Sequence, residues 1–304
     1  MRLNPPATGF LGAPIETDPG RIEADFAILG VPFGWPYPRA GSSAGCIEAP
    51  AAIRRRAERL ADFRGHWDFD LAGPMLPADG APRLVDAGNA PGHPGDGPGN
   101  SAAVSEAVTT IVRRGAVPVC IGGDDSVVIP ILRAFAGHGP LAVLQVDAHL
   151  DFRDEVRGVR EGYSSPMRRA SEMEHVSRIV QVGLRGVGSA RPADVDDARA
   201  AGNVLVTAAE VRERGVGRAL EQLPSDGPVF VAFDCDGLDP SVFPAVSAPS
   251  PGGLTYAEAS ELLAGVGGRL AGAVFTEYVP ALDDSGLSAL VAVRLILRAI
   301  GSPA

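Results

Sequence analysis

Residues 143–153 read Val-Leu-Gln-Val-Asp-Ala-His-Leu-Asp-Phe-Arg, an apolar run that ends in three potential metal ligands. The run is typical of a buried parallel strand, and Asp147, His149 and Asp151 follow it. If the chain stays extended there, the alternation of side chains places all three ligands on one side. An imidazole between two carboxylates suits a divalent cation such as Mn²⁺, Zn²⁺, Co²⁺ or Ni²⁺. The alternative is a strand end with solvated charges.

A second stretch repeats this pattern later in the chain. The apolar run Val229–Phe233 ends in Asp234 and Asp236, again on one side of an extended chain. Acidic residues also follow two other predicted strands, at Asp125 and at Glu277. Because ligands gather beyond the carboxyl ends of strands in open parallel sheets, these positions predict one shared metal site.

Apolar strands alternate with helices along the whole chain. This alternation predicts an α/β fold in which helices cover both faces of a parallel sheet. We find no linker and no change in composition, so we expect a single domain over 1–304, with 1–23 as an irregular N-terminal arm. The predicted strands are Asp25–Phe33, Arg83–Asp86, Val117–Ile121, Val143–Val146, Arg178–Leu184, Asn203–Val206, Val229–Asp234 and Ala271–Glu277. The predicted helices are Ala51–Phe63, Ser101–Arg114, Val127–Ala136, Pro166–Met173, Ala193–Ala201, Ala208–Leu223, Tyr256–Val266 and Leu287–Ile300, and the predicted loops include Arg39–Gly45 and Gly88–Asn100.

Composition excludes several classes of protein. The formal charge is −10 and no stretch rich in Lys and Arg stands out, which argues against nucleic-acid binding. No apolar run approaches the roughly 20 residues of a membrane span, and the first residues lack the apolar core of a signal peptide. The three cysteines, Cys46, Cys120 and Cys235, cannot all pair. Their number argues for a reducing, cytoplasmic location.

Several motifs together resemble those of the ureohydrolase superfamily, which includes arginase and agmatinase, with the agmatinase-like branch nearest. They are Gly-Gly-Asp-Asp-Ser (122–126), Asp-Ala-His-Leu-Asp (147–151), Ser-Ser-Pro-Met-Arg-Arg-Ala (164–170), Phe-Asp-Cys-Asp-Gly-Leu-Asp-Pro (233–240), Pro-Gly-Gly-Leu-Thr-Tyr (251–256) and Glu-Tyr-Val-Pro (277–280). The resemblance implies an arginase-like three-layer α/β/α sandwich around an eight-stranded parallel sheet, in a trimer or hexamer. It also implies two metal ions, Mn²⁺ first, that serve the hydrolysis of a small guanidino compound to urea and an amine.

The same resemblance assigns roles to individual residues. Asp147 and Asp234 would bridge the two ions, Asp151 would bind one ion, and His149 and Asp236 would bind the other. Glu277 would receive the substrate guanidinium, for which a planar carboxylate contact is apt.

The chain departs from the family at several of these positions. Asp125 stands where the family has a histidine ligand, and the added negative charge should reduce the Lewis acidity of the centre. Tyr163 or Ser164 stands where the family has a histidine in its catalytic loop, and we expect both residues at the substrate. The segment Ala245–Pro249 replaces Gly-Thr-Gly-Thr-Pro and lacks its threonine hydroxyls. His93 could supply a replacement ligand, although a lone histidine in a loop is usually solvated.

Two further hypotheses remain open. Agmatine is the first choice of substrate, but Arg153 follows the ligand Asp151 and would favour a guanidino acid such as guanidinobutyrate if it points inward. The replacement at Asp125 also allows a non-catalytic protein that keeps the fold for binding or as a subunit of a mixed oligomer.

Overall fold

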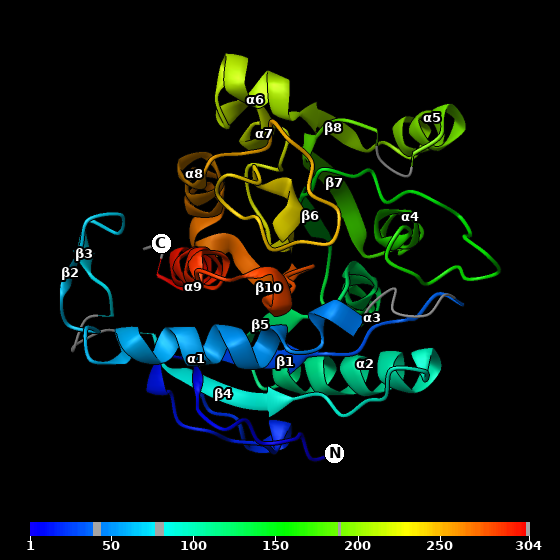
Figure 1. Cartoon of the computed structure of the whole chain (residues 1–304). Coiled ribbons are helices and arrows are strands. Elements are labelled where there is room, and N and C mark those ends of the chain that lie inside the picture. The colour runs from blue at the N-terminus through cyan, green and yellow to red at the C-terminus, as the bar shows by residue number, and fades with distance from the viewer. Residues whose placement is uncertain (39–43, 77–81, 188–189, 302–304) are drawn as a thin grey trace.

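The computed structural model describes residues 1–38, 44–76, 82–187 and 190–301. At its centre lies an eight-stranded sheet whose neighbouring strands all run parallel (Figure 1). In spatial order the strands are β4 (Leu84–Asn89), β1 (Phe26–Val31), β5 (Val117–Gly122), β10 (Leu270–Thr276), β9 (Val229–Asp234), β6 (Leu141–Val146), β7 (Val176–Leu184) and β8 (Val204–Thr207). The expected eight-stranded parallel sheet is confirmed.

Helices cover both faces of this sheet and form one buried apolar cluster on each face (Figure 1). Alternate strand residues serve opposite clusters, as Val143 and Leu144 of β6 do. One face carries α1 (Ala49–Ala61), α6 (Ala208–Arg214), α7 (Gly217–Leu220), α8 (Tyr256–Val266) and α9 (Leu287–Ile300). The other carries α2 (Gly97–Arg113), α3 (Val128–Arg133), α4 (Pro166–Ser171) and α5 (Pro192–Ala200). The three-layer α/β/α sandwich is therefore confirmed.

Local capping decides where several helices begin. The Thr255 side chain accepts a hydrogen bond from the Glu258 backbone N–H, and the Glu258 carboxylate accepts one from the Thr255 N–H, so α8 begins where predicted. α2 begins earlier than predicted, at Gly97, because the Asp96 side chain caps it through the Gly99 N–H.

One other predicted helix differs from the structure, and one predicted loop lies mostly outside the described residues. The single helix expected over 208–223 is divided into α6 and α7, because Gly215 has a φ of +77° and ends the first helix. Most of the predicted loop Arg39–Gly45 lies outside the described residues.

A buried ion pair ties the N-terminal arm to the sheet and to α1. Arg54 of α1 donates from Nε to Asp86 Oδ2 (2.8 Å) and from one Nη to Asp86 Oδ1 (2.9 Å). Asp86 of β4 also accepts the N–H groups of Phe10 and Gly88, both at 2.9 Å. Both charged side chains are almost fully buried, 1% and 0% exposed, so this contact holds three parts of the chain together in the core.

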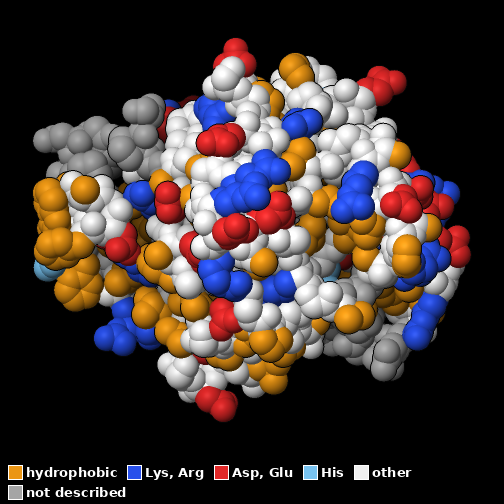
Figure 2. All heavy atoms as spheres, turned by 90° about the horizontal axis from the view of Figure 1, so that it is seen from above, with side chains coloured by type: hydrophobic (Ala, Val, Ile, Leu, Met, Phe, Trp, Pro, Cys, Tyr) orange, Lys and Arg blue, Asp and Glu red, His pale blue; other side chains and the backbone are white. Residues whose placement is uncertain are grey.

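Outside the sandwich, a small antiparallel hairpin of β2 (Trp67–Asp68) and β3 (Gly73–Pro74) follows α1. Trp67 and Phe69 are largely exposed on it, and hydrophobic side chains gather at the corresponding left edge of Figure 2. Elsewhere on that face, basic and acidic side chains lie interspersed. Among the helices of the described chain, none has the length and apolarity that a membrane crossing requires.

Candidate metal centre

The predicted site residues follow four strands that lie side by side in the middle of the sheet. In spatial order these strands are β5, β10, β9 and β6. Asp147 comes directly after β6, Asp234 is the last residue of β9, and Glu277 comes directly after β10. Asp125 begins a short 3-10 helix beyond β5. Because parallel strands end at the same edge, all four segments meet there.

The backbone turns sharply after β6. Asp151 has a φ of +48°, and the segment from Asp147 to Asp151 is not part of the strand. The expectation of an extended segment with alternating ligands is therefore wrong. The ligand side chains still come together, because the chain turns back on itself after Asp147. In this turn Asp147 Oδ1 accepts the His149 backbone N–H at 2.6 Å.

A similar correction applies after β9. Residues Cys235–Gly237 form a 3-10 helix, so Asp234 and Asp236 do not alternate along an extended strand. Instead the Asp236 N–H donates to Asp234 Oδ1 at 2.8 Å. The missing side chain of Gly237 lets this turn pack against the other one, because a Cβ there would lie 2.8 Å from the Asp147 nitrogen.

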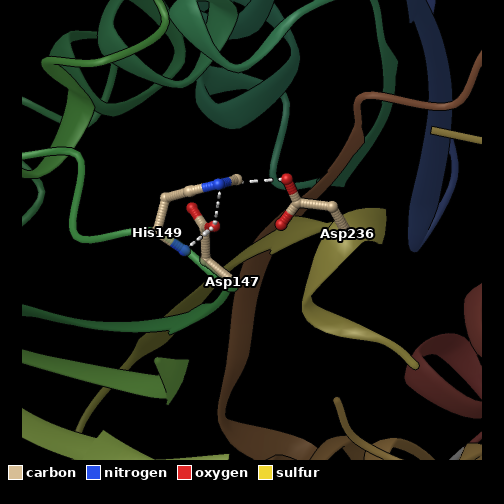
Figure 3. Close-up of side chains that lie close together, drawn as sticks. All are labelled: Asp147, His149 and Asp236. Carbon is tan, nitrogen blue, oxygen red and sulfur yellow. Dashed lines mark hydrogen bonds and ion pairs between the residues drawn. The ribbon is translucent and has the colours of Figure 1, made fainter. Parts of the chain in front are cut away.

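His149 joins the two turns (Figure 3). Its Nδ1 lies 3.0 Å from Asp236 Oδ2 and 3.5 Å from Asp147 Oδ1. Burial lowers the pKa of His149, but hydrogen bonds with Asp147 and Asp236 outweigh it and raise this pKa to about 10. Asp147, His149 and Asp236 thus offer one imidazole nitrogen and two carboxylate oxygens within 4.8 Å of one another.

A second group of potential ligands overlaps the first. Asp125, Asp147 and Asp151 also bring one oxygen each within 4.8 Å of one another. Asp125 Oδ1 accepts the Thr276 hydroxyl at 2.7 Å, whereas its buried Oδ2 has no hydrogen-bond partner. Asp147 belongs to both groups, which is the arrangement expected of a carboxylate shared by two cations.

Glu277 lies beside these ligands in a strained conformation. It has a φ of +63°, a region that costs a non-glycine residue roughly 1–3 kcal/mol and that occurs often at functional sites. Its Oε1 accepts the Asp125 backbone N–H at 2.9 Å, and the Cys46 thiol lies 3.8 Å from its Oε2. Burial, and then repulsion from Asp124, raise the pKa of Glu277 well above its usual value.

The carboxylates of the site are buried together, and His149 is the one basic side chain in the two ligand groups found among the described residues. Burial, followed by repulsion between neighbouring carboxylates, raises the pKa of Asp147, Asp151 and Asp234 well above the usual value. Such a cluster is costly when charged, and two dications would cancel most of its charge. The donor types and the unpartnered Asp125 Oδ2 therefore fit a pair of divalent metal ions.

A cavity of about 270 Å³ opens above these residues. It is lined by Asp125, His149, Asp151, Tyr163, Ser164, Asp234, Asp236, Ser247, Ala248 and Glu277. Tyr163 and Ser164 are thus beside the predicted ligands, as expected of substrate-binding residues. Behind them, Tyr37 packs edge-on against the Tyr163 ring and accepts the Ser164 N–H at 3.2 Å. Sequence patterns did not indicate Tyr37, which lies in the loop after β1 and belongs to none of the motifs.

Two residues considered from the sequence lie elsewhere. Arg153 does not line the cavity, and its Nε lies 3.6 Å from the carboxylate of Asp194 in α5. Asp194 thus holds the Arg153 side chain toward α5, and this position does not support the prediction that Arg153 contacts substrate. His93 is exposed near the start of α2, where its Nδ1 accepts the Gly95 N–H, so it is not placed to replace a ligand.

The raised pKa values predict how the metal-free protein responds to pH. Burial raises the pKa of Asp125 to about 7, from 3.8. Between these values the folded protein keeps a proton that the unfolded chain loses, so stability falls as the pH rises through this window. Metal ions bind the deprotonated groups and restore stability. We therefore expect Mn²⁺ to raise the melting temperature more at about pH 8 than at about pH 5.5, in thermal unfolding with and without metal. An equal rise at both pH values would contradict this assignment.

Comparison with known proteins places the chain in a family. The model of the arginase family matches residues 24–301. The chain belongs to the arginase family. The resemblance seen in the motifs is thereby confirmed.

Among the relatives, the agmatinase of Sodalis glossinidius is 31% identical over 301 residues, covering 96% of this chain and 91% of that protein. The agmatinase of Salmonella newport is 32% identical over 302 residues, covering 96% and 92%. The structure of proclavaminate amidino hydrolase from Streptomyces clavuligerus superposes with a TM-score of 0.81 at 28% identity, covering 97% and 96%. That of Trypanosoma cruzi formiminoglutamase with Mn²⁺ gives 0.80 at 27% identity, covering 92% and 95%.

Proposed function

We propose that this arginase-family protein is a metal-dependent amidinohydrolase that converts agmatine to urea and an amine. The observation that carries the proposal is the meeting of Asp125, Asp147, His149, Asp151, Asp234 and Asp236 beside Glu277 at the ends of four adjacent strands. Mn²⁺ is our first choice of metal, since a structural relative contains it. Ni²⁺, Co²⁺ and Zn²⁺ suit the same ligands.

In this proposal, one set of residues binds the metal ions and Glu277 binds the substrate. Two bound ions would supply Lewis acidity and lower the pKa of water. Asp125, Asp147, His149, Asp151, Asp234 and Asp236 would hold these ions. Glu277 would accept the guanidinium through both carboxylate oxygens, a planar pairing that the low polarity of its buried position strengthens. The Asp125 N–H holds one of these oxygens in place.

The lining of the cavity supports a substrate with a cationic far end. None of the described residues that line it is Lys or Arg, so a distal carboxylate finds no cationic partner there. A distal ammonium, in contrast, can lie against the Tyr163 ring and near the Ser247 hydroxyl. Because Arg153 pairs with Asp194, the reason for a guanidino acid is weakened.

A comparison of two substrates tests this choice. The Mn²⁺-loaded protein should release urea from agmatine with a kcat/KM at least about tenfold above that for 4-guanidinobutyrate, because one unfavourable charge costs on the order of 1–3 kcal/mol. Arg153→Ala should leave this ratio unchanged. If the kcat/KM ratio shifted toward agmatine in the variant, Arg153 would lie at the substrate. If no metal and no guanidino compound gave urea, the proposed function would be wrong.

The second candidate is a non-catalytic role, because Asp125 stands where the family has a histidine ligand. If its extra charge weakens one metal position, Asp125→His should bind the second ion more tightly and hydrolyse agmatine faster, each by roughly tenfold. Metal content per chain and urea release measure the two effects. A wild-type protein that holds no metal would favour the non-catalytic candidate, whereas a variant with unchanged metal content and rate would show that Asp125 is not a ligand.

The state of assembly and the location are predictions from the sequence. We propose a homo-oligomer, trimer or hexamer, in a reducing cytoplasm, without nucleic-acid or membrane partners. Light scattering of the purified protein measures its mass directly, and a monomer at micromolar concentration would contradict the first part.

A further inference from the structure

Three buried amide side chains lie in a line that crosses the sheet toward Asp147. Gln145 of β6 is 1% exposed, Gln181 of β7 is 0% exposed, and Asn203, just before β8, is 7% exposed. Gln145 and Gln181 are register partners on adjacent strands. Burying an amide among apolar residues is unfavourable unless its hydrogen bonds are made, so three in sequence require a reason.

The hydrogen bonds fix the orientation of every amide in this line. Gln145 Nε2 donates to Asp147 Oδ2 at 2.6 Å, so Gln145 must present its oxygen to the next strand. Gln181 Nε2 donates to that oxygen at 2.6 Å and to the Leu150 carbonyl at 2.7 Å, which uses both of its N–H groups. Its own oxygen accepts Asn203 Nδ2 at 2.9 Å. In each hydrogen bond between these side chains, the N–H donor therefore lies on the residue farther from Asp147.

Asp147 is the residue whose position matters most in the proposed centre. It is the only member common to both groups of ligands found among the described residues. The His149 N–H holds its Oδ1, and Gln145 holds its Oδ2. The Leu150 carbonyl, which Gln181 binds, lies in the turn between the ligands His149 and Asp151.

We propose that Gln145, Gln181 and Asn203 form an amide relay that positions Asp147 as the carboxylate shared by both metal ions. The inference rests on the proposed metal centre and adds residues that touch neither metal nor substrate. Partners of this kind orient a ligand and typically change metal affinity by about 10–100-fold when they are lost.

The direction of the relay gives it a distinctive test. Gln181→Glu keeps the size of the side chain but removes its N–H donors. With these donors gone, Gln145 could bond to the side chain at position 181 only by turning its own N–H toward it, which would present the Gln145 oxygen to Asp147 and remove the donor there. A residue that does not touch Asp147 would thus change the metal site. A side chain that only filled space would not have this effect.

The experiment measures Mn²⁺ affinity by competition with a chelating indicator, with thermal unfolding of each metal-free variant beside it. Gln145→Met and Gln181→Glu should bind Mn²⁺ about 10–100-fold more weakly than wild type. Val180→Ala is the matched control, because Val180 is equally buried next to Gln181 but belongs to the cluster on one face of the sheet. It should lose stability and keep its metal affinity.

The outcomes separate the relay from the function on which it rests. Wild-type protein that binds no Mn²⁺ overturns the proposed metal centre and the relay with it. Wild-type binding with unchanged affinity in both relay variants overturns the relay alone. If either variant does not fold, Asn203→Asp takes its place, because Asn203 is the most exposed of the three and the change withdraws the donor that Gln181 receives. Unchanged affinity in that variant also counts against the relay.

Discussion

His149→Ala is expected to bind metal so weakly that the purified protein retains almost none. His149 supplies the one nitrogen among the six predicted ligands, and the remaining groups are carboxylates that repel one another. Loss of a ligand should cost at least as much as loss of a ligand's partner, so we expect metal affinity and kcat/KM to fall by about 100-fold or more. Metal content after gel filtration and urea release from agmatine measure these effects.

The control for this variant is His138→Ala. His138 is exposed and lines a different, mostly apolar cavity, which contains Phe135 and Leu141. Its removal should change neither metal content nor rate. Full metal content in His149→Ala would show that the imidazole is not a ligand, even though it lies between Asp147 and Asp236.

Arg54→Met is expected to destabilise the fold by about 3–5 kcal/mol, because it leaves the charge of Asp86 buried without its partner. The two Arg54 hydrogen bonds to Asp86 and one to the Gly88 carbonyl would be lost together. The free energy of unfolding in denaturant, measured on metal-free protein, gives the loss directly.

Arg59→Met in the same helix is the matched control, since Arg59 is exposed. It should change the free energy of unfolding by less than about 0.5 kcal/mol. If Arg54→Met proved as mild as this control, the buried pair would contribute little and the arm would be held mainly by its apolar contacts, such as those of Phe10.

The sequence predicted the elements whose boundaries have a local cause. Thr255 and Glu258 cap α8 at the expected residue, and the apolar runs of β6 and β9 continue to the ligands. These runs and the acidic residues after them were enough to expect a site at one edge of a parallel sheet. The alternation along the chain indicated eight strands, and the resemblance to the family then implied that all eight belong to one sheet.

Features that depend on distant contacts could not be read in the same way. The positive φ values of Asp151 and Glu277 depend on packing between turns, and no sequence periodicity reports them. Arg153 was ambiguous because its partner, Asp194, lies in a helix far along the chain. Gln145 did leave a signal, since it is the lone polar residue of β6, and Gln181 lies between two valines of β7, but only the register of β6 and β7 shows that they meet.

The position of β10 has a consequence for the order of folding. It is the last strand of the sheet in the chain, yet it lies between β5 and β9 in the middle of the sheet. On a growing polypeptide, β5 and β9 both emerge before β10, and neither can pair with this shared neighbour until β10 has been synthesised. Glu277 and Thr276, which contact Asp125, arrive only at that moment. Contacts of such long sequence separation form slowly. Metal capture should therefore coincide with completion of the sheet and draw the nascent protein toward its final state.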